Sequence, residues 1–479
     1  MEALKQLFEQ HFGSAALRVQ PVQGGLGGSG RVIVRLANDE HTAIGVMHDV
    51  PEENAAFLEF SRHFRAHGLP VPEIYGADEA AGAYLEEDLG DTTLFQFLAQ
   101  HRRGVEIAPE VVSAYRKVVE ILPRFQVQAG RDLYYGVCYP RASFDRQSIA
   151  WDLNYFKYYF LKLAGVPFHE QALEEDFERL TEFLLKAERG YFLYRDFQSR
   201  NIMLCDGQPY FLDYQGGRKG ALQYDIASLL FDAKAELPPE LRGQLLDQYL
   251  DALSEYVKLK RETFLEHYYG FVYVRIMQAL GAYGFRGFYE RKAHFLQSVP
   301  YALRNVRWLL HNVKLPIELP ALMQAFTDMV GSEKLHGLAS PVTMAAEELT
   351  VTVTSFSFHR GPVQDESGNG GGFVFDARCL PNPGREEQFK TLTGRDAAVI
   401  EYLEQQETVG RFLESAMNLV EGSVAEYERR GFRNLMVSFG CTGGQHRSVY
   451  LAEQAARRLK KRRGLQVVVR HREQEMWVR

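Results

Sequence analysis

The stretch Tyr194-Arg195-Asp196-Phe197-Gln198-Ser199-Arg200-Asn201, followed by Phe211-Leu212-Asp213-Tyr214-Gln215, decides the fold of this chain. It places an aspartate, then an asparagine five residues later, then a second aspartate twelve residues after the asparagine. Apolar residues typical of a strand precede the second aspartate. Phosphoryl transfer needs one carboxylate for the acceptor hydroxyl, and an amide and a carboxylate for a divalent cation. The spacing therefore predicts a kinase catalytic loop followed by a metal-binding turn.

Length and composition indicate a soluble protein of more than one domain. The chain has 479 residues, 46% of them hydrophobic and 24% charged, so two or three domains are expected. We find no apolar run long enough to span a membrane, and the acidic, helix-patterned start is not that of a signal peptide. The four cysteines are scattered without a CxxC pair. This pattern favours a cytoplasmic location and argues against a structural zinc site.

The order of the patterns predicts an α+β bilobal protein-kinase-like domain followed by a smaller α/β domain. Strand-like stretches around a glycine-rich turn and a helix form a predicted small lobe at about 1–90, and mainly helical, aromatic-rich patterning forms a large lobe at about 91–330. Residues 331–348 are weakly patterned and are expected to be a linker. From residue 349 to 479, four strands alternate with helices at 396–430 and 447–461.

The kinase-like residues have separate expected roles. Asp196 is the candidate catalytic residue that accepts a hydrogen bond from the acceptor hydroxyl, and Asn201 and Asp213 are the candidate ligands that hold Mg²⁺ against ATP. The glycine-rich turn would let backbone N–H groups approach the phosphates, through Gly27, Gly28, Ser29 and Gly30. The alternative is that these carboxylates only cap helices and turns.

At these residues the first 330 positions resemble the aminoglycoside phosphotransferase (choline-kinase-like) family. The strings 211–216 and 223–233 are similar to those of its amino-sugar kinase branch, AmgK, as are 46–51 and 85–91. The resemblance implies phosphorylation of the anomeric hydroxyl of N-acetylmuramate and N-acetylglucosamine, in cell-wall sugar recycling. It also implies that Glu87, Asp88 and Leu89 form the adenine-binding hinge and that Asp225 braces the catalytic loop.

Two positions depart from that family. Tyr194 stands where most members have histidine, and no lysine lies at 42–48, where a phosphate-contacting lysine is usual. We expect Arg31, Arg35 or another basic group to supply the missing charge. The alternative is a pseudokinase that binds nucleotide without turnover.

The candidate substrate contacts are less specific than the catalytic ones. The aromatic run at 151–156 could stack on a sugar face, with Asp152 binding a hydroxyl, or could simply pack in the core. Arg275 and Arg286 could meet a carboxylate or phosphate of the substrate. The predicted substrate set is Arg200, Gln215, Asp152 and Arg275.

A second motif lies near the C-terminus, where Gly440-Cys441-Thr442-Gly443-Gly444-Gln445-His446-Arg447-Ser448 joins a predicted strand to a predicted helix. Two glycines permit tight curvature, and the N–H groups at the start of a helix favour an anion. The motif suits either a cysteine phosphatase, with Cys441 as nucleophile and Arg447 as clamp, or simple phosphate binding.

From about 353 to 473 the chain resembles the C-terminal domain of the RNase adapter RapZ. The strings that carry the resemblance are 355–358, 375–383, 392–394, 440–450 and 470–472. The resemblance implies glucosamine-6-phosphate sensing, binding of a small regulatory RNA, and self-association into oligomers. The implied anion site comprises Cys441, Thr442, Gly443, Gly444, His446, Arg447, Ser448, Arg378 and Asn382, although the last two could form only a structural turn.

The charge distribution weakens the case for RNA. Residues 351–479 carry 19 Lys and Arg against 16 Asp and Glu, far from the basic excess of a dedicated RNA-binding domain. The sequence as a whole predicts an ATP- and Mg²⁺-dependent amino-sugar kinase with a phosphosugar-sensing C-terminal domain. The alternative is a non-catalytic RNA- or metabolite-binding adaptor with a nucleotide-sensing pseudokinase domain.

Overall fold

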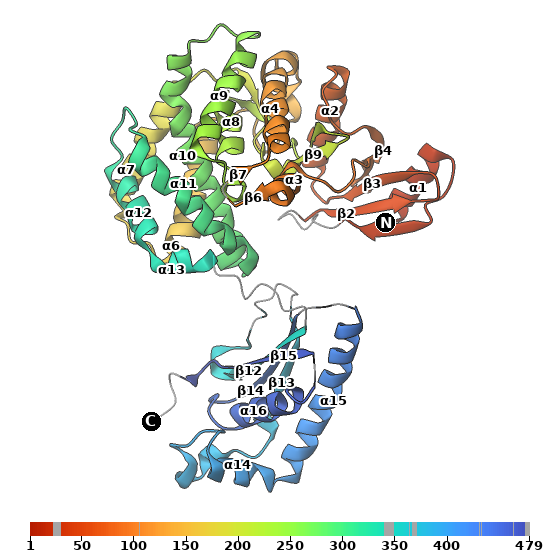
Figure 1. Ribbon diagram of the computed structural model, residues 1–479, viewed down its shortest axis with the longest axis vertical. Helices are drawn as coiled ribbons and strands as arrows, with labels where there is room; N and C mark the ends of the chain where they lie inside the picture. The colour runs from red at the N-terminus through yellow and green to blue at the C-terminus, as the bar shows by residue number, and fades with distance from the viewer. Residues whose placement is uncertain are drawn as a thin grey trace. The chain divides into compact units, whose positions relative to one another are not determined.

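The computed structural model describes residues 1–22, 30–104, 106–339, 349–363, 365, 371–430, 432, 434–462 and 464–474. The chain divides into two compact units, Met1–Arg291 with Phe295–Ala339, and Lys292–His294 with Ser340–Arg479 (Figure 1). Of the expected linker at 331–348, residues 340–348 lie outside the described part. Within the described ranges, none of the helices combines the length and the apolar character that a membrane crossing requires.

The first unit begins with a small antiparallel sheet and the helix α1 (Glu2–Phe12), which covers one of its faces. The strand order is β1 (Arg18–Pro21), β2 (Val32–Ala37), β3 (Thr42–Met47), β5 (Ala83–Glu87) and β4 (Ile74–Asp78). Leu4 and Phe8 of α1 are fully buried against Leu36 and Leu85 of the strands. At Gly45 a Cβ would lie 2.6 Å from Leu36 Cδ1 and 2.9 Å from Leu4 Cδ1, so glycine allows α1 to lie close to the sheet.

The helix α2 (Pro51–Ala66) connects this sheet to the rest of the unit. Proline at its start and Glu52 and Glu53 in its first turn favour helix initiation. Its apolar face packs on residues of the large lobe: the Phe57 ring stacks on Tyr214 at 5.0 Å, and the Phe64 ring meets Phe192 edge-on at 5.2 Å. The sequence's helix prediction for this segment is confirmed, and the packing fixes α2 beside the loops that carry the acidic residues.

The large lobe is helical and shares one aromatic-rich core. Three short antiparallel ribbons lie within its described part: β6 (Arg102–Arg103) with β7 (Glu106–Ile107), β8 (Tyr191–Leu193) with β11 (Arg218–Gly220), and β9 (Ile202–Cys205) with β10 (Gln208–Phe211). The helices of the lobe are α3 (Leu94–His101), α4 (Pro109–Pro123), α5 (Arg146–Tyr155), α6 (Lys162–Ala164), α7 (Glu170–Leu184), α8 (Gln223–Leu230), α9 (Pro239–Ser254), α10 (Arg261–Gly284), α11 (Val299–Asn312), α12 (Pro320–Gly331) and α13 (Glu333–His336). The bilobal kinase-like architecture predicted from the sequence is therefore confirmed.

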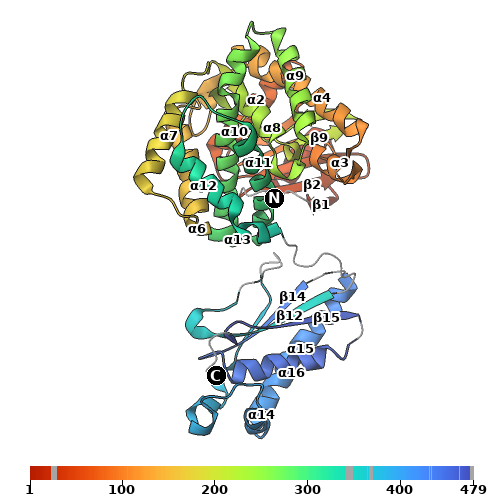
Figure 2. The ribbon, with the colours of Figure 1, turned by 60° about the vertical axis from the view of Figure 1, so that its left-hand side comes forward.

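The second unit is a parallel α/β domain, as predicted. Its strand order is β13 (Phe373–Asp376), β14 (Asn434–Cys441), β12 (Leu349–Ser357) and β15 (Leu465–His471). The two central strands, β12 and β14, are almost continuously buried, as expected of a parallel sheet. The helices α15 (Glu407–Arg430) and α16 (Arg447–Leu459) contact this sheet and each other (Figure 2).

The helical stretch predicted at 396–430 is two helices, α14 (Ala397–Glu404) and α15, rather than one. Leu403 and Val409 are both fully buried in the core of this unit. On one continuous helix these two residues would point about 120° apart, since each residue advances about 100°. The break between the helices lets both side chains reach the same core.

Candidate active site and anion loop

Three polar residues predicted from the sequence meet at the ends of the short strands in the large lobe. Asp196 follows β8, Asn201 immediately precedes β9, and Asp213 follows β10. The Asn201 Nδ2 donates to the Asp196 main-chain oxygen at 2.9 Å and to Asp213 Oδ2 at 2.9 Å. Because both amide hydrogens are directed to acceptors, the amide oxygen is the atom of Asn201 that can bind a cation. An all-oxygen pair of amide and carboxylate suits Mg²⁺.

The backbone of Asp213 adopts a left-handed conformation with φ of +68°. Gln215 Nε2 donates to Asp213 Oδ1 at 2.7 Å, so the carboxylate is held from both sides. Burial and the neighbouring Asp196 carboxylate raise the pKa of Asp213 to about 6, against the opposing effect of Gln215, Arg31 and Asn201. The Asp196 and Asp213 carboxylates repel each other when both are charged, and a bound cation would relieve this repulsion.

Arg31 is the candidate for the positive charge that no lysine of β3 provides. It lies immediately before β2, and its guanidinium is 2.9 Å from Glu53 Oε2 on α2 and 3.3 Å from Asp213 Oδ1. The other candidate, Arg35, binds the Asp88 carboxylate at 2.6 Å and Asp91 at 2.9 Å. Arg35 therefore binds carboxylates of the predicted hinge region, whereas Arg31 lies beside the candidate metal ligand Asp213.

A buried network holds the catalytic loop in place. The Asp225 carboxylate accepts hydrogen bonds from the backbone nitrogens of Tyr194 at 2.9 Å and Arg195 at 3.0 Å, and from Gln126 Nε2 at 2.9 Å. Burial raises the pKa of Asp225 to about 7, while these three donors favour its charged form. Tyr194 Oη donates to the Leu212 carbonyl at 2.6 Å. Tyrosine thus links the catalytic loop to the residue before Asp213.

The hinge residues are held partly by side chains. Asp88 is bound by Arg35 and also accepts from the Gly90 backbone nitrogen at 3.1 Å. The Glu87 backbone nitrogen donates to the Glu73 carbonyl at 2.8 Å, and Leu89 is buried. Gly27, Gly28 and Ser29 of the predicted phosphate loop lie outside the described residues. At Gly30 a Cβ would meet open space.

The predicted substrate residues do not form one group. The Asp152 carboxylate is bound by both terminal nitrogens of Arg195, at 2.6 and 2.7 Å, which holds Arg195 in its left-handed backbone conformation of φ +83°. Buried Arg275 donates through Nε to Ser228 Oγ at 2.8 Å. Exposed Arg200 lies over the Phe95 ring. Only Gln215 touches the Asp213 carboxylate, so the substrate roles of Asp152, Arg200 and Arg275 stay predictions.

In the second unit, the predicted anion loop joins the buried end of β14 to the start of α16. Cys441 Sγ lies 3.1 Å from Ser448 Oγ and accepts from the Gly444 backbone nitrogen at 3.2 Å. Gly444 has φ of +72°, and α16 begins at Arg447 without a side-chain cap. Thr442 and Gly443 are the exposed part of the loop. An anion would meet backbone N–H groups there rather than the buried thiol.

The remaining predicted anion residues make structural contacts. Arg447 NH1 donates to the carbonyls of Arg378 and Leu380 at 3.0 Å each, and its NH2 donates to Thr442 Oγ1 at 3.2 Å. These contacts favour a role in shaping the loop over the phosphate clamp of a phosphatase.

The Arg378 side chain binds Asp376 at 2.6 Å, and Asn382 Oδ1 accepts from the Gly384 nitrogen in a turn. His446 Nε2 donates to the Phe389 carbonyl at 2.9 Å, and burial lowers its pKa.

One residue beside the loop was missed in the sequence. Glu473 is buried, and a Cβ on Gly444 would lie 2.5 Å from its Cγ. Its carboxylate accepts from the Ser357 nitrogen at 3.2 Å, Arg472 Nε at 2.8 Å and Arg360 at 3.1 Å. Although burial opposes it, these donors hold the pKa of Glu473 below its usual range. Glu473 lies 26 residues beyond Arg447, and only the pairing of β15 with β12 brings the following turn to the loop.

Comparison with known proteins matches each unit separately. The phosphotransferase enzyme family matches residues 22–260, and the RapZ C-terminal domain matches residues 349–475. A nucleotide-binding protein of Azoarcus sp. (strain BH72) is 46% identical over 128 residues, which are 27% of this chain and 41% of that protein. One of Xylella fastidiosa (strain 9a5c) is 36% identical over 183 residues, 38% of this chain and 61% of the other. The chain thus spans between about two fifths and three fifths of these relatives.

Solved structures similar to this chain include small-molecule kinases. The choline kinase LicA from Streptococcus pneumoniae is 16% identical and covers 65% of this chain and 98% of its own, with a TM-score of 0.44. The amicoumacin kinase hAmiN is 12% identical over 64% of this chain and 94% of its own, with a TM-score of 0.40. The two family matches, at residues 22–260 and 349–475, show that the chain joins a domain of the phosphotransferase enzyme family to a RapZ C-terminal domain.

Proposed function

We propose that the chain is an ATP- and Mg²⁺-dependent kinase that phosphorylates an amino sugar of the N-acetylglucosamine and N-acetylmuramate class at its anomeric hydroxyl. The observation that carries the kinase part is the grouping of Asp196, Asn201 and Asp213 with the Arg31–Glu53 ion pair. The amino-sugar part rests on the resemblance of the strings around Asp213 and Asp225 to the AmgK branch of the family.

The residues of the site suit phosphoryl transfer without covalent catalysis. Asp196 accepts the hydrogen bond of the acceptor hydroxyl and orients its oxygen, which contributes about 10²–10⁴-fold. Asn201 Oδ1 and the Asp213 carboxylate hold Mg²⁺, and this cation, when bound, neutralises charge on the ATP phosphates. Arg31 adds a fixed positive charge beside Asp213, and Glu53 fixes the direction of its guanidinium.

For the second unit we propose a phosphosugar-binding role at the loop from Cys441 to Ser448. The exposed Thr442 and Gly443, next to the uncapped start of α16, support binding of a phosphate group by backbone N–H donors. Binding of a sugar phosphate at this loop would allow the product or a related metabolite to regulate the kinase. RNA is a less favoured ligand, because the basic excess of this unit is small.

The test of the kinase proposal is ATP consumption by the full chain with N-acetylglucosamine, N-acetylmuramate, glucosamine and N-acetylgalactosamine, with the phosphate position read by ³¹P NMR. We expect a sugar-1-phosphate. Asp196→Ala should lower turnover about 10²–10⁴-fold without unfolding the protein. A matched control is Asp206→Asn, since Asp206 is an exposed aspartate in the turn between β9 and β10.

Two outcomes would contradict the proposal in different ways. Turnover retained in Asp196→Ala would remove Asp196 from the catalytic role. Nucleotide binding with no turnover on any sugar would favour the alternative adaptor, in which the first unit senses nucleotide only. In that case salt-dependent RNA binding by the full chain is the next measurement, because phosphate contacts make such binding steeply dependent on ionic strength.

A further inference from the structure

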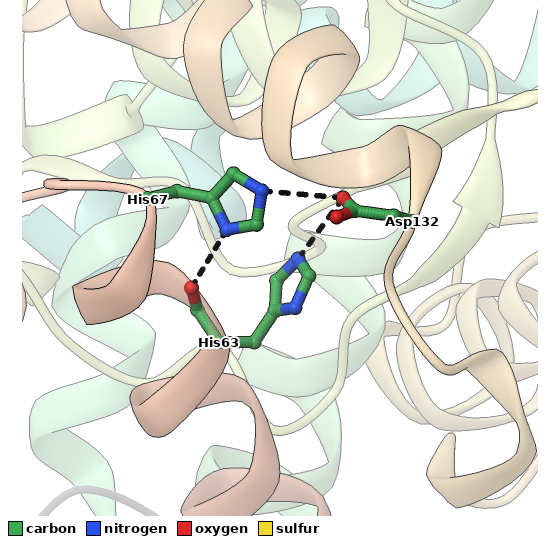
Figure 3. A group of neighbouring side chains, drawn as sticks. All are labelled: His63, His67 and Asp132. Atoms are coloured by element: carbon green, nitrogen blue, oxygen red, sulfur yellow. Dashed lines mark hydrogen bonds and ion pairs between the residues drawn. The ribbon is translucent and has the colours of Figure 1, made fainter.

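Two histidines and an aspartate gather in the first unit, away from the catalytic residues in sequence. His63 and His67 lie one turn apart at the end of α2, and Asp132 follows the short 3-10 turn at Ala129–Arg131 (Figure 3). One ligand atom from each of the three lies within 4.8 Å of the other two. Among the residues that the structure describes, this is the one such group of three or more histidine, cysteine or acidic side chains.

We infer that His63, His67 and Asp132 form a binding site for a divalent transition metal of the zinc class. In a tetrahedral zinc site with ligand bonds of about 2.0–2.1 Å, neighbouring ligand atoms are about 3.3 Å apart. The Asp132 Oδ1 lies 3.2 Å from His67 Nε2 and 3.7 Å from His63 Nε2. Both separations are within half an ångström of that value, and the ligand atoms of the two histidines lie within 4.8 Å of each other.

The protonation of His67 suits metal binding. Its Nδ1 lies 2.9 Å from the His63 carbonyl oxygen, and a carbonyl only accepts, so the proton must be on Nδ1. In the neutral imidazole this leaves a lone pair on Nε2, the atom that faces Asp132. A backbone acceptor that fixes the far nitrogen of a histidine is the usual support of a metal ligand.

His63 needs one rearrangement. Its Nε2 donates to the Ala129 carbonyl at 2.8 Å, so this nitrogen has to give up its proton before it can bind a cation. The proton moves to Nδ1 through solvent, and the imidazole remains neutral. The Ala129 carbonyl is then placed to accept from a metal-bound water.

The environment allows an ion to enter and a fourth ligand to bind. The side chains of His63 and His67 are 15% and 23% exposed, and that of Asp132 is 65% exposed. Water can therefore complete the coordination. Two imidazoles and one carboxylate favour zinc, cobalt or nickel over magnesium or calcium, which prefer oxygen ligands.

Metal binding here would act on the helix that carries the partner of Arg31, a step that rests on the proposed kinase function. Glu53, which binds Arg31, lies in the first turn of α2, His63 lies in its last turn, and His67 is the residue immediately after the helix. Asp132 comes from the segment after α4, so the ion would tie the end of α2 to the large lobe. A stabilised α2 would hold Glu53 and hence Arg31 in place.

The test is a titration of the chelator-treated full chain with Co²⁺ in excess Mg²⁺, which saturates oxygen-ligand sites. We expect one equivalent of Co²⁺ with the visible bands of a four-coordinate nitrogen and oxygen site, displaced by Zn²⁺, and a rise in melting temperature with Zn²⁺. His67→Gln and Asp132→Asn should each weaken Co²⁺ binding at least tenfold and abolish the thermal shift.

His311→Gln is the matched control. His311 is an exposed helical histidine whose Nδ1 donates to the carbonyl of Arg307 at 2.7 Å, the same local bond that His67 makes. This variant should bind Co²⁺ as the wild type does. The inference would be overturned if the wild type bound no Co²⁺. It would also be overturned if the Asp132→Asn and His67→Gln variants bound Co²⁺ with the affinity and visible spectrum of the wild type. Because Asp132 is largely exposed, Asp132→Asn tests the site without disturbing the core.

Discussion

The guanidinium of Arg31 lies 2.9 Å from Glu53 on α2, and the same side chain reaches Asp213 at 3.3 Å. An arginine that precedes β2 thus connects the small-lobe helix to the candidate metal ligand. Its side chain is only 9% exposed. The Arg31 guanidinium therefore lies mostly out of solvent, while the Glu53 and Asp213 side chains are 33% and 37% exposed, so water screens the ion pairs in part.

Replacement of Arg31 should impair catalysis more than folding. We expect Arg31→Met to lower kcat/KM for ATP by about 10²–10³-fold, because a fixed charge near the phosphates is lost. Glu53→Gln should cause a smaller loss, since the arginine remains but is less well oriented. Steady-state kinetics with varied ATP measure both effects. Equal activity of Arg31→Met and the wild type would show that another group supplies the charge.

Tyr194 should matter through its hydroxyl group. Tyr194→Phe removes the 2.6 Å bond to the Leu212 carbonyl and leaves that carbonyl without this donor. We expect a loss of about 1–2 kcal/mol in unfolding free energy and a lower affinity for Mg²⁺, because Leu212 precedes Asp213. Tyr134→Phe, at a tyrosine that is 64% exposed, is the control and should be neutral. If Tyr134→Phe lowered the unfolding free energy as much as Tyr194→Phe does, the loss could not be assigned to the hydrogen bond of Tyr194.

The sequence predicted the order of the elements and the grouping of three candidate site residues, because both depend on local spacing, and the catalytic and metal-binding roles of these residues stay predictions. Asp196, Asn201 and Asp213 lie within one loop–ribbon–loop segment, so their grouping follows from short-range structure. The sequence left the source of the missing charge open among Arg31, Arg35 and another basic group, and in the structure Arg35 is bound by Asp88 and Asp91 whereas Arg31 lies beside Asp213. That distinction depends on side-chain packing between distant segments, which spacing alone does not reveal.

The same limit explains what was missed or left open. His63 and His67 share a helix face four residues apart, but Asp132 joins them only through the packing of α2 beside the segment after α4. Asp152 was predicted either to bind a sugar hydroxyl or to pack in the core, and in the structure its carboxylate is bound by Arg195, so its substrate role stays a prediction. The sequence around an isolated polar residue on a helix does not show which distant residue it will contact, so its partner is known only from the tertiary structure.

Glu86 should make the stability of the protein depend on pH. This residue of β5 is 8% exposed, and burial raises its pKa to about 8, against the opposing effect of Arg31. A carboxyl whose pKa is higher in the folded state than in the unfolded state binds more protons when folded. Its contribution to stability is therefore full below about pH 4.5 and is lost as the pH rises through about 8.

We expect Glu86→Gln to become more stable relative to the wild type as the pH increases from 4.5 to 8, by a few kcal/mol in total, and to level off above that. Melting temperatures of the two proteins across this pH range measure the difference. Glu87→Gln, at the less buried neighbour, is the control and should show a smaller trend. A constant difference between Glu86→Gln and the wild type would mean that Glu86 is already charged at low pH.

The two glycines of the C-terminal loop should respond differently to alanine. Gly443 is exposed and a Cβ there meets nothing within 4 Å, whereas Gly444 has φ of +72° and a Cβ would lie 2.5 Å from Glu473 Cγ. We expect Gly444→Ala to lower the unfolding free energy by about 1–3 kcal/mol. Gly443→Ala should leave stability unchanged but weaken glucosamine-6-phosphate binding about tenfold, because the methyl group fills the space that a phosphate would use.

Calorimetric titration with glucosamine-6-phosphate, and with glucosamine as the unphosphorylated control, measures the binding effect, and thermal unfolding measures the stability effect. Binding unchanged in Gly443→Ala, with normal stability, would place the phosphosugar outside this loop. Binding lost in both variants with only Gly444→Ala destabilised would support the loop as the site. The pair separates loop shape from ligand contact because the two positions are adjacent but only one is conformationally restricted.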